Sequence, residues 1–276
     1  MDFKAIFDIA REELIINIRN KWTIIFAIVF GVLVVGIAYV GILAEGFSGV
    51  QSFTRTSASL LNLILYIVPL VALTMGTLSF TGDKGSTELL FSQPVSRSEV
   101  LLGKLTGLFF SIAISTLLGF TLAGAIVMTA GGNDGLLRYT AFVLLSLTLS
   151  LVFLSISLLV ATANKRRAKA FGFSLFLWFF FVIFYDLVTL GGTLLLRGQS
   201  ANLFLFLSLF GNPVDMVRVA SLIILDNVTI FGAAGAVLLR FLGGYTASVF
   251  LLCVGLMAWC CLPLIATRFL VRHQDI

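Results

Sequence analysis

The chain has 276 residues, of which 59% are hydrophobic and only 11% are charged, with a formal net charge of +5. Soluble domains carry about 25% charged residues, so this composition excludes an ordinary soluble enzyme. The hydrophobic residues are gathered in long runs, which is typical of an integral membrane protein in a lipid bilayer. The basic residues lie at the ends of these runs and form no aromatic-rich basic patch, so the positive charge does not indicate nucleic-acid binding.

The first 22 residues form a patterned arm before the first apolar run. Apolar side chains recur in the arm at helical spacing, as Phe3, Ile6, Phe7, Ala10, Leu14, Ile18 and Trp22. This pattern predicts an amphipathic helix lying in the headgroup region of the membrane. A charged anchor that only sets the orientation of the chain is the alternative. The acidic residues of the arm and the length of the following run argue against a cleaved signal peptide.

Six runs are long and apolar enough to span a membrane, which takes about 20 residues. The predicted spans are Thr23–Ala44, Ala58–Phe80, Leu105–Ala130, Leu136–Ala163, Ala168–Leu196 and Thr246–Leu270. Pro69 and Pro263 lie inside two of them, a position that membrane helices tolerate. We therefore predict an all-α integral membrane protein with six transmembrane helices, in which residues 1–276 form a single domain.

Lysine and arginine residues are unevenly divided between the two sides that six spans create. Most of them lie in the N-terminal arm, in the loops after the second and fourth spans, and at the C-terminus. The other side carries only Arg55, Arg138, Arg197, Arg218 and Arg240. Because short loops rich in lysine and arginine stay in the cytoplasm, both termini are predicted to be cytoplasmic.

The polar segment 86–97, between the second and third spans, begins with the signals of a short helix. Ser86 or Thr87 can cap this helix, and Glu88 then lies in its first turn, where a carboxylate is favourable. Its apolar side chains are Leu89, Leu90 and Phe91. A short amphipathic helix on the cytoplasmic face suits docking into a groove of a soluble partner. An ordered membrane loop without a partner is the alternative.

The same segment contains a bend and a second helix start. Pro94 ends the short helix, because proline cannot continue a helical ladder. Ser96 and Glu99, on either side of Arg97, then fit a capping box. The second helix is predicted to run directly into the third span, so this construction would transmit a push into the membrane.

The chain offers no recognisable ATP-binding site. The run GDKGST has the residues of a phosphate-binding loop in the wrong order and without the required spacing. No polar region is long enough to form a nucleotide-binding domain. We therefore expect no catalysis and no bound cofactor in this chain, and we expect ATP and magnesium to bind to a separate ATPase.

Residues 197–245 form the long connection between the fifth and sixth spans, on the outer side. Asn212 is suited to cap a helix there, with Pro213 at the first helical position and Asp215 in the first turn. Asp215 and Arg218 are three residues apart and are therefore neighbours on the helix surface. This helix is predicted to be a docking edge for an extracytoplasmic partner, with simple amphipathic anchoring as the alternative.

A second helical piece is expected after the break at Asp226 and Asn227. Together the two pieces predict a pair of outer helices, either at the interface or dipping back into the membrane. The alternative is a seventh span over Val228–Leu242. That run is short, contains glycines, and would move the basic C-terminus to the outer side.

Asp186 is the only carboxylate well inside a predicted span, near the outer end of the fifth one. Acidic residues within a membrane are costly and usually face an interior cavity or a partner. We expect Asp186 to line an outward vestibule or to contact an outer partner. Solvation among the headgroups is the alternative.

Cys253, Met257 and Cys260 or Cys261 follow one another at helical spacing in the sixth span. Soft sulfur ligands suit Cu(I), which makes these residues weak candidates for a metal site. Cysteine and methionine are also ordinary apolar fillers, and this interpretation is preferred. Three cysteines so close together form no disulfide framework. His273 has no ligand cluster around it.

The segment between the second and third spans resembles the signature loop of the ABC-2 type permeases of ABC transporters. The family pattern E-L-L-x-S-x-P-V-S-R-x-x-x-L-L-G-K is matched by Glu88-Leu89-Leu90, Ser92, Pro94-Val95-Ser96-Arg97 and Leu101-Leu102-Gly103-Lys104. The resemblance implies that this segment is a coupling helix seated on a cytoplasmic ABC ATPase dimer. It also implies that two copies of the chain form the translocation unit, in the cytoplasmic (inner) membrane of a bacterium or archaeon.

Within this family the chain resembles the permease of the nitrous-oxide reductase maturation system. The resemblance rests on AREEL…RNKW (10–22), WFFFVIFYDL (178–187) and NPVDMVRV (212–219), and on the subfamily residues Asp186, Asn212, Pro213, Asp215 and Arg218. It implies a periplasmic copper-binding accessory protein as partner and a role in assembling a copper–sulfur centre. The alternatives are an exporter of an unrelated lipid or small molecule, and a mechanical transmission subunit through which no substrate passes.

Overall fold

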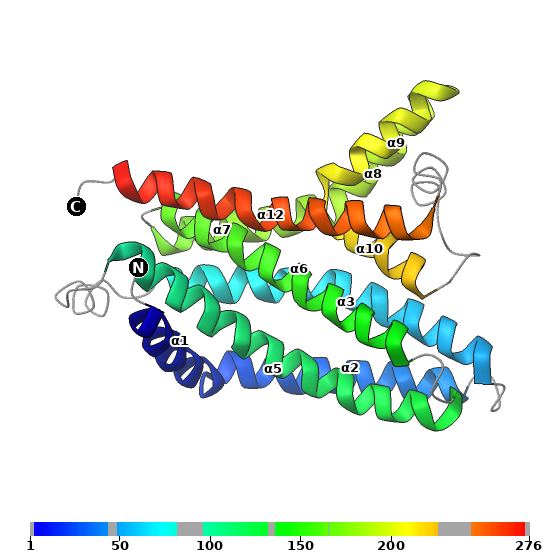
Figure 1. The fold of residues 1–276 in the computed structure, drawn as a ribbon, viewed down its shortest axis with the longest axis horizontal. Helices are drawn as coiled ribbons and strands as arrows, with labels where there is room; N and C mark the ends of the chain where they lie inside the picture. The colour runs from blue at the N-terminus through cyan, green and yellow to red at the C-terminus, as the bar shows by residue number, and fades with distance from the viewer. Residues whose placement is uncertain are drawn as a thin grey trace.

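A computed structural model describes residues 3–43, 49–81, 96–131, 136–164, 166–225 and 244–273. Within these ranges all regular structure is helical (Figure 1). The helices are α1 (Phe3–Ile18), α2 (Lys21–Leu43), α3 (Gly49–Phe80), α5 (Arg97–Gly131), α6 (Leu136–Ala163), α7 (Arg167–Phe179), η2 (Phe180–Phe184), α8 (Tyr185–Leu195), α9 (Gln199–Gly211), α10 (Pro213–Ile224) and α12 (Tyr245–His273).

The prediction of six spans is confirmed. Six helical segments are long and apolar enough to cross a membrane: α2, α3, α5, α6, the continuous run α7–η2–α8, and α12. The chain is therefore a multi-pass membrane protein. The largest difference from the prediction is that α3 begins at Gly49, well before the expected Ala58. Hydropathy marks the apolar part of a helix, and here the helix continues through a polar stretch that hydropathy alone does not register.

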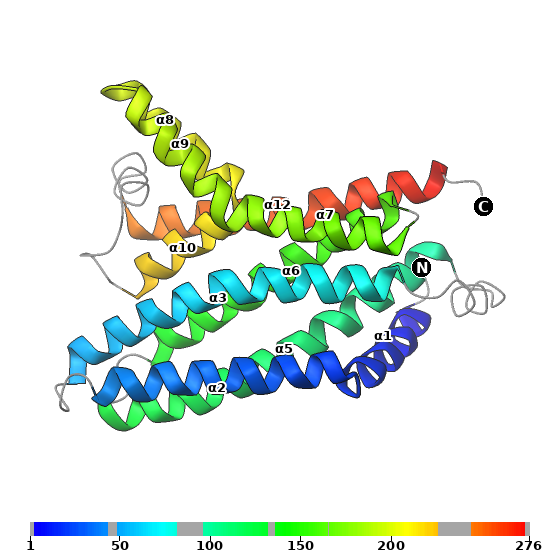
Figure 2. The same cartoon turned by 180° about the vertical axis from the view of Figure 1, so that it is seen from behind.

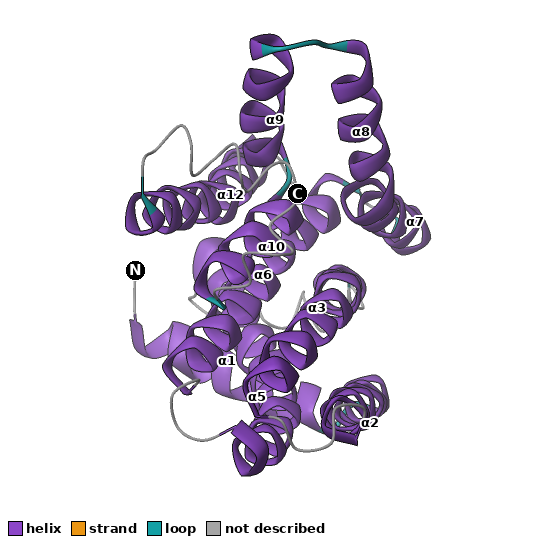
Figure 3. Cartoon of the chain, turned by 90° about the vertical axis from the view of Figure 1, so that its right-hand side faces the viewer, coloured by secondary structure: helices purple, strands orange, loops and turns teal. Residues whose placement is uncertain are grey.

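The two ends of the bundle differ in charge and shape. The beginning of α1 and the last turns of α12 lie at the same end, which we call the basic end because the described residues Lys104, Arg166, Arg167, Arg268 and Arg272 lie there (Figure 1). Toward the other end, α8 and α9 lie side by side and project sideways from the bundle (Figure 3). We call this second end the hairpin end.

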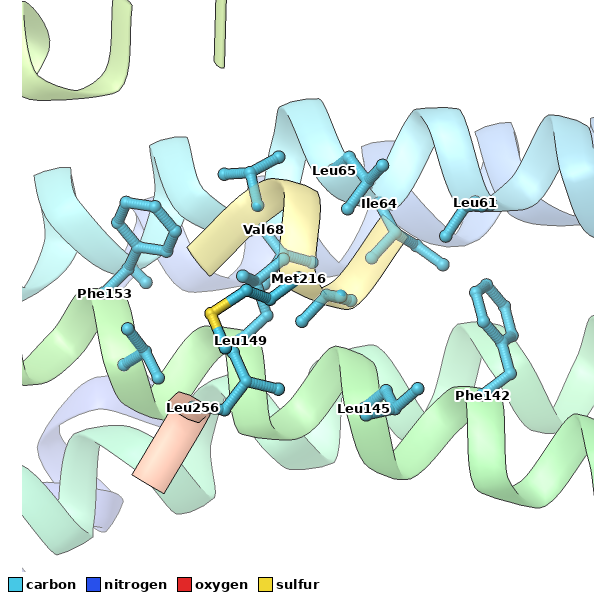
Figure 4. Packing of buried hydrophobic residues seen from close by; sticks show 14 of the residues in the cluster. Leu61, Ile64, Leu65, Val68, Phe142, Leu145, Leu149, Phe153, Met216 and Leu256 are labelled. Carbon is cyan, nitrogen blue, oxygen red and sulfur yellow. The ribbon is translucent and has the colours of Figure 1, made fainter. Parts of the chain in front are cut away.

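The apolar core extends from α2 and α5 to α12, and the part of it drawn in Figure 4 lies between α3, α6, α10 and α12. Leu149 and Phe153 of α6 face Val68 of α3 and Met216 of α10, and all four side chains are fully buried. Several buried serines also lie on α6, where a polar group needs a hydrogen-bond partner. Their hydroxyl groups donate to carbonyl oxygens of the preceding turn of the same helix, at Ser146, Ser150, Ser155 and Ser157. The serines therefore allow close packing around α6 without leaving an unsatisfied group.

The fifth span is interrupted by a turn of π-helix, η2 (Phe180–Phe184). The Tyr185 N–H donates to the Phe180 carbonyl, five residues earlier, where an α-helix would use the Phe181 carbonyl, four residues earlier. This interruption lies where the chain leaves the bundle as α8 (Figure 3). Gly198, with a φ of 62°, supplies the positive-φ backbone at the turn into α9, which glycine adopts readily.

The chain returns to the core through a sharp corner between α9 and α10. The two helices are bent by 105° relative to each other. The predicted helix starting at Pro213 is confirmed as α10, and it dips back between α3, α6 and α12. The second piece of the predicted outer pair, and the alternative span Val228–Leu242, lie outside the described residues.

The N-terminal arm forms the predicted helix, α1, beside the beginning of α5 (Figure 2). Its large apolar residues Phe3 and Phe7 are exposed, as is Trp22 at the start of α2. Its buried side chains are polar, Glu13 and Asn17. The side of α1 that packs on the protein is therefore not the side that carries the most apolar surface.

Candidate functional site

Two polar clusters join elements that are distant in the sequence. The outer cluster, at the hairpin end, consists of Asp186, Asn212, Asp215 and Arg218. The arm cluster, at the basic end, consists of Glu13, Asn17 and Ser79. Between them lies the apolar core, to which α3, α6, α10 and α12 contribute.

Arg218 of α10 is the centre of the outer cluster. Its guanidinium contacts both carboxylate oxygens of Asp186, with Nη1–Oδ1 at 3.2 Å and Nη2–Oδ2 at 3.1 Å. It also donates to Asp215 Oδ1 at 2.6 Å, which confirms the predicted neighbourhood of these two residues on one helix. A bidentate pair between a guanidinium and a carboxylate fixes both distance and orientation. The pair thus ties the fifth span to α10.

Asn212 connects the same helix to the π-helical turn. Its Oδ1 accepts the Val214 N–H at 3.0 Å, so the predicted N-cap is confirmed. Its Nδ2 donates to the Phe181 carbonyl at 2.9 Å and to Asp215 Oδ2 at 3.0 Å. The Phe181 carbonyl is the one to which the Tyr185 N–H would donate in a regular α-helix. With one side chain, Asn212 therefore hydrogen-bonds to a carbonyl of the π-helical turn and caps the N-terminus of α10.

The last turn of α9 is held in a similar way. A helix ends with carbonyl groups that have no partner within the helix. The Tyr185 hydroxyl donates to the Ser208 carbonyl at 2.7 Å, and the Trp259 Nε1–H donates to the Phe210 carbonyl at 2.9 Å. The corner between α9 and α10 is thus fixed by side chains of the fifth and sixth spans.

The residues of the outer cluster differ in their exposure. Asn212 and Pro213 are buried, and the Asp215 side chain is 14% exposed. The Arg218 and Asp186 side chains are 28% and 40% exposed. The open side of the cluster is therefore the ion pair between the fifth span and α10, while the start of α10 is turned inward. Sequence reasoning selected all four residues of the cluster but missed the pairing of Asp186 with Arg218.

The predicted coupling segment is described only at its end. Ser86, Thr87, Glu88, Leu89, Leu90, Phe91 and Pro94 lie outside the described residues. The capping box after them is confirmed, because the Ser96 N–H donates to Glu99 Oε2 at 2.9 Å and the Glu99 N–H donates to Ser96 Oγ at 3.4 Å. Helix α5 begins at Arg97 and continues through the third span without a break, as predicted.

The arm cluster was not predicted from the sequence. Glu13 and Asn17 of α1 are 8% and 5% exposed. Glu13 Oε1 accepts a hydrogen bond from Ser79 Oγ at 2.6 Å and another from Asn17 Nδ2 at 2.8 Å. Ser79 lies in the last turn of α3, so the cluster joins the N-terminal arm to the end of the second span.

A glycine seam, which also contacts Glu13, joins the same side of α1 to the start of α5. A Cβ on Gly107 would lie 2.5 Å from the Ala10 carbonyl oxygen, and a Cβ on Gly103 would lie 2.7 Å from Ile9 Cβ. Glycines four residues apart let two helices approach closely within a membrane. The spacing Gly-Lys-Leu-Thr-Gly is visible in the sequence and is the signal that could have located this contact.

The sulfur-bearing residues of α12 do not form one group. Cys260 is buried, with its Sγ 3.4 Å from the Ser155 hydroxyl, whereas Cys253, Met257 and Cys261 are exposed. Cys260 therefore faces α6 and the other three face away from the core. Among the described residues, no group of three histidine, cysteine or acidic side chains is placed to hold a metal ion. The role of the sulfur atoms stays a prediction.

Comparisons with known proteins agree on a family. A family model described as ABC-2 family transporter protein matches residues 7–274. The chain is 33% identical over 279 residues to the probable ABC transporter permease protein NosY of Stutzerimonas stutzeri, with 98% of each chain covered. It is 34% identical over 238 residues to the probable ABC transporter permease protein NosY of Pseudomonas aeruginosa, with 84% of each chain covered.

Proposed function

The chain belongs to the ABC-2 family of transporter proteins, as the permease subunit of an ABC transporter, and we propose that it passes ATP-driven motion from the basic end of its bundle to its outer helices. The ATPase is a separate cytoplasmic dimer that binds ATP and magnesium. The basic end faces the cytoplasm of a bacterial or archaeal cell, with the chain in the inner membrane. Two copies of the chain form the transmembrane unit.

The observation that carries this proposal is the way α1 bridges the two helices that flank the coupling segment. The segment lies between Thr81, at the end of α3, and Ser96, at the start of α5. Glu13 holds the end of α3 through Ser79, and the seam at Gly107 holds the start of α5. A displacement of the segment by the ATPase would thus move both spans and α1 as one unit.

In this proposal the outer cluster is the region that moves in response, on the outer side of the membrane. Helix α10 packs in the same core as α3 and α6, so movement of these spans reaches α10 through fully buried contacts. The bidentate pair of Arg218 with Asp186 then transmits the movement of α10 to α8. The partly open face of this pair, and the projecting helices α8 and α9, form the surface on which an extracytoplasmic partner docks.

For the partner and the process we propose maturation of nitrous-oxide reductase. The subfamily residues Asp186, Asn212, Asp215 and Arg218 support this assignment, because they form one connected network. The similarity to two NosY permeases, along 84% or more of the chain, also supports this assignment. The outer partner is a periplasmic copper-binding protein, and the process is assembly of the copper–sulfur centre.

Two modes of action are compatible with this role, and the core favours one of them. The side chains at the centre of the bundle, such as Leu149, Met216 and Val68, are apolar and fully buried. A hydrophilic solute would have to desolvate to pass between them. We therefore propose mechanical transmission to the outer partner as the main mode. Export of an unrelated lipid or small molecule is the second candidate, because an apolar interior suits an apolar cargo.

The coupling role is tested by breaking the segment before α5. Glu88→Lys, or a Gly-Gly insertion after Pro94, should abolish stimulation of the ATPase by the permease in proteoliposomes, while membrane insertion stays intact. Glu12→Lys makes the same charge change on the exposed side of α1 and should leave the stimulation unchanged. Full stimulation in both coupling variants would refute the proposal.

The two modes of action are separated by a flux measurement. Sealed vesicles that contain the permease and its ATPase are loaded with copper or sulfur species and supplied with ATP. Transmission predicts ATP hydrolysis without movement of these species across the bilayer. ATP-dependent accumulation on one side would establish transport instead.

A further inference from the structure

A groove at the basic end lies apart from both polar clusters. It has a volume of about 210 Å³ and opens between α5, α6 and α12. Helix α6 packs against both of the other helices and supplies Leu158 at the groove. The lining includes Ser98, Leu102, Leu264, Ile265 and Arg268.

The chemistry of this lining is that of an amphiphile site. Most of the wall is leucine, isoleucine and valine, and Arg268 is the one charged residue among those lining it. Arg268 is exposed, and no described residue hydrogen-bonds to it or pairs with it. A guanidinium binds phosphate oxygens strongly because its N–H groups match their geometry. Ser98 adds a hydroxyl to the same lining.

The position of the groove indicates which amphiphile occupies it. It lies near the end of α12, a span of which only 22% is buried within the chain. Ile265, an apolar side chain of the lining, is 51% exposed. Basic residues at the end of a membrane helix reach the headgroup level, and pockets with such residues between helices bind anionic lipid headgroups. A phosphate at Arg268 would thus be at the depth of the headgroups, with the leucine walls at the depth of the acyl chains.

We propose that this groove binds an anionic phospholipid, with its phosphate at Arg268 and Ser98 and an acyl chain along Leu102 and Leu264. The bound lipid fills the space between the first turns of α5 and the last turns of α12. Helix α5 begins directly after the predicted coupling segment. The lipid therefore stabilises the helix that the ATPase would displace through this segment. The binding itself does not depend on the proposed function.

The test uses the full chain in nanodiscs of mixed phosphatidylcholine and phosphatidylglycerol, followed by native mass spectrometry. The wild-type chain should retain phosphatidylglycerol preferentially. Arg268→Gln should weaken this retention roughly tenfold, because a charge-assisted hydrogen bond to the phosphate is lost. Leu102→Trp, which fills the groove from α5, should displace the lipid while every charge is kept.

Matched controls separate this site from general attraction to the basic end. Arg167→Gln removes the same charge at the same end, on α7, outside the groove. It should leave the retention unchanged. Equal losses in Arg167→Gln and Arg268→Gln would reduce the effect to surface charge and overturn the proposal. Equal retention of phosphatidylcholine and phosphatidylglycerol would also overturn it, as would unchanged retention in Leu102→Trp.

Discussion

The two polar clusters hold the chain together in different ways. The outer cluster is centred on charges, with two carboxylates around the Arg218 guanidinium, and these three charged side chains are 14% to 40% exposed. The arm cluster contains one carboxylate, Glu13, which accepts hydrogen bonds from neutral groups and is 8% exposed. Next to it, the seam at Gly107 brings two helices into backbone contact.

This difference indicates what each region must do. A close-packed seam with small residues transmits displacement because it has few alternative arrangements. An ion pair with partial exposure is weaker and can be exchanged for contacts with water or with another protein. In the proposed function, the basic end therefore acts as a rigid connection between helices, and the hairpin end acts as a connection that a partner can change.

The largest expected effect comes from breaking the charged connection. Arg218→Gln leaves Asp186 and Asp215 close together without a cation. Removing one partner of a fully buried pair costs 3–5 kcal/mol, and the exposure of this pair reduces the expected loss to about 2–3 kcal/mol. Thermal unfolding of the purified protein in micelles measures it. Asp186→Asn in the same chain should recover part of the loss.

The control for this variant is Arg197→Gln, which removes an exposed arginine near the tip of the hairpin. Its melting temperature should match that of the wild type. A loss as large as that of Arg218→Gln would mean that the total charge of the hairpin end, and not the specific pair, determines its stability.

A smaller loss is expected from the rigid connection. Gly107→Val places a side chain where the Ala10 carbonyl oxygen is only 2.5 Å from the new Cβ, and backbone cannot yield as a side chain can. Overpacking of this kind costs about 1–3 kcal/mol. We expect α1 to detach from α5, and a cysteine placed at Ile9 should become reactive to a membrane-impermeant reagent. Gly172→Val, at a glycine with open space around it, should leave the labelling of that cysteine unchanged.

The smallest effect is expected at the carboxylate of the arm cluster. Glu13→Gln keeps the Oε1 acceptor for Ser79 and Asn17, so the free energy of unfolding should fall by less than about 1 kcal/mol. Differential scanning calorimetry measures this change. A loss as large as that of Arg218→Gln would show that the negative charge of Glu13 is essential, and the contrast between the two clusters would disappear.

Local patterns predicted much of the site as well as the spans. The capping box at Ser96 and the N-cap at Asn212 were predicted because each depends on residues within three or four positions. The contact of Asp215 with Arg218 was predicted for the same reason. The pairing of Asp186 with Arg218 was not predicted, because it joins side chains 32 residues apart across the α9–α10 corner.

The sequence was sufficient to predict a membrane protein with six spans, the residues at which α5 and α10 begin, and the family of the chain. Length and hydropathy are sufficient for the spans, because a bilayer requires about 20 apolar residues in each helix. The π-helical turn in the fifth span, the burial of Glu13 and the return of α10 to the core became visible only in the folded chain. These features arise where one helix satisfies a polar group of another, and such contacts leave no periodic pattern along the chain.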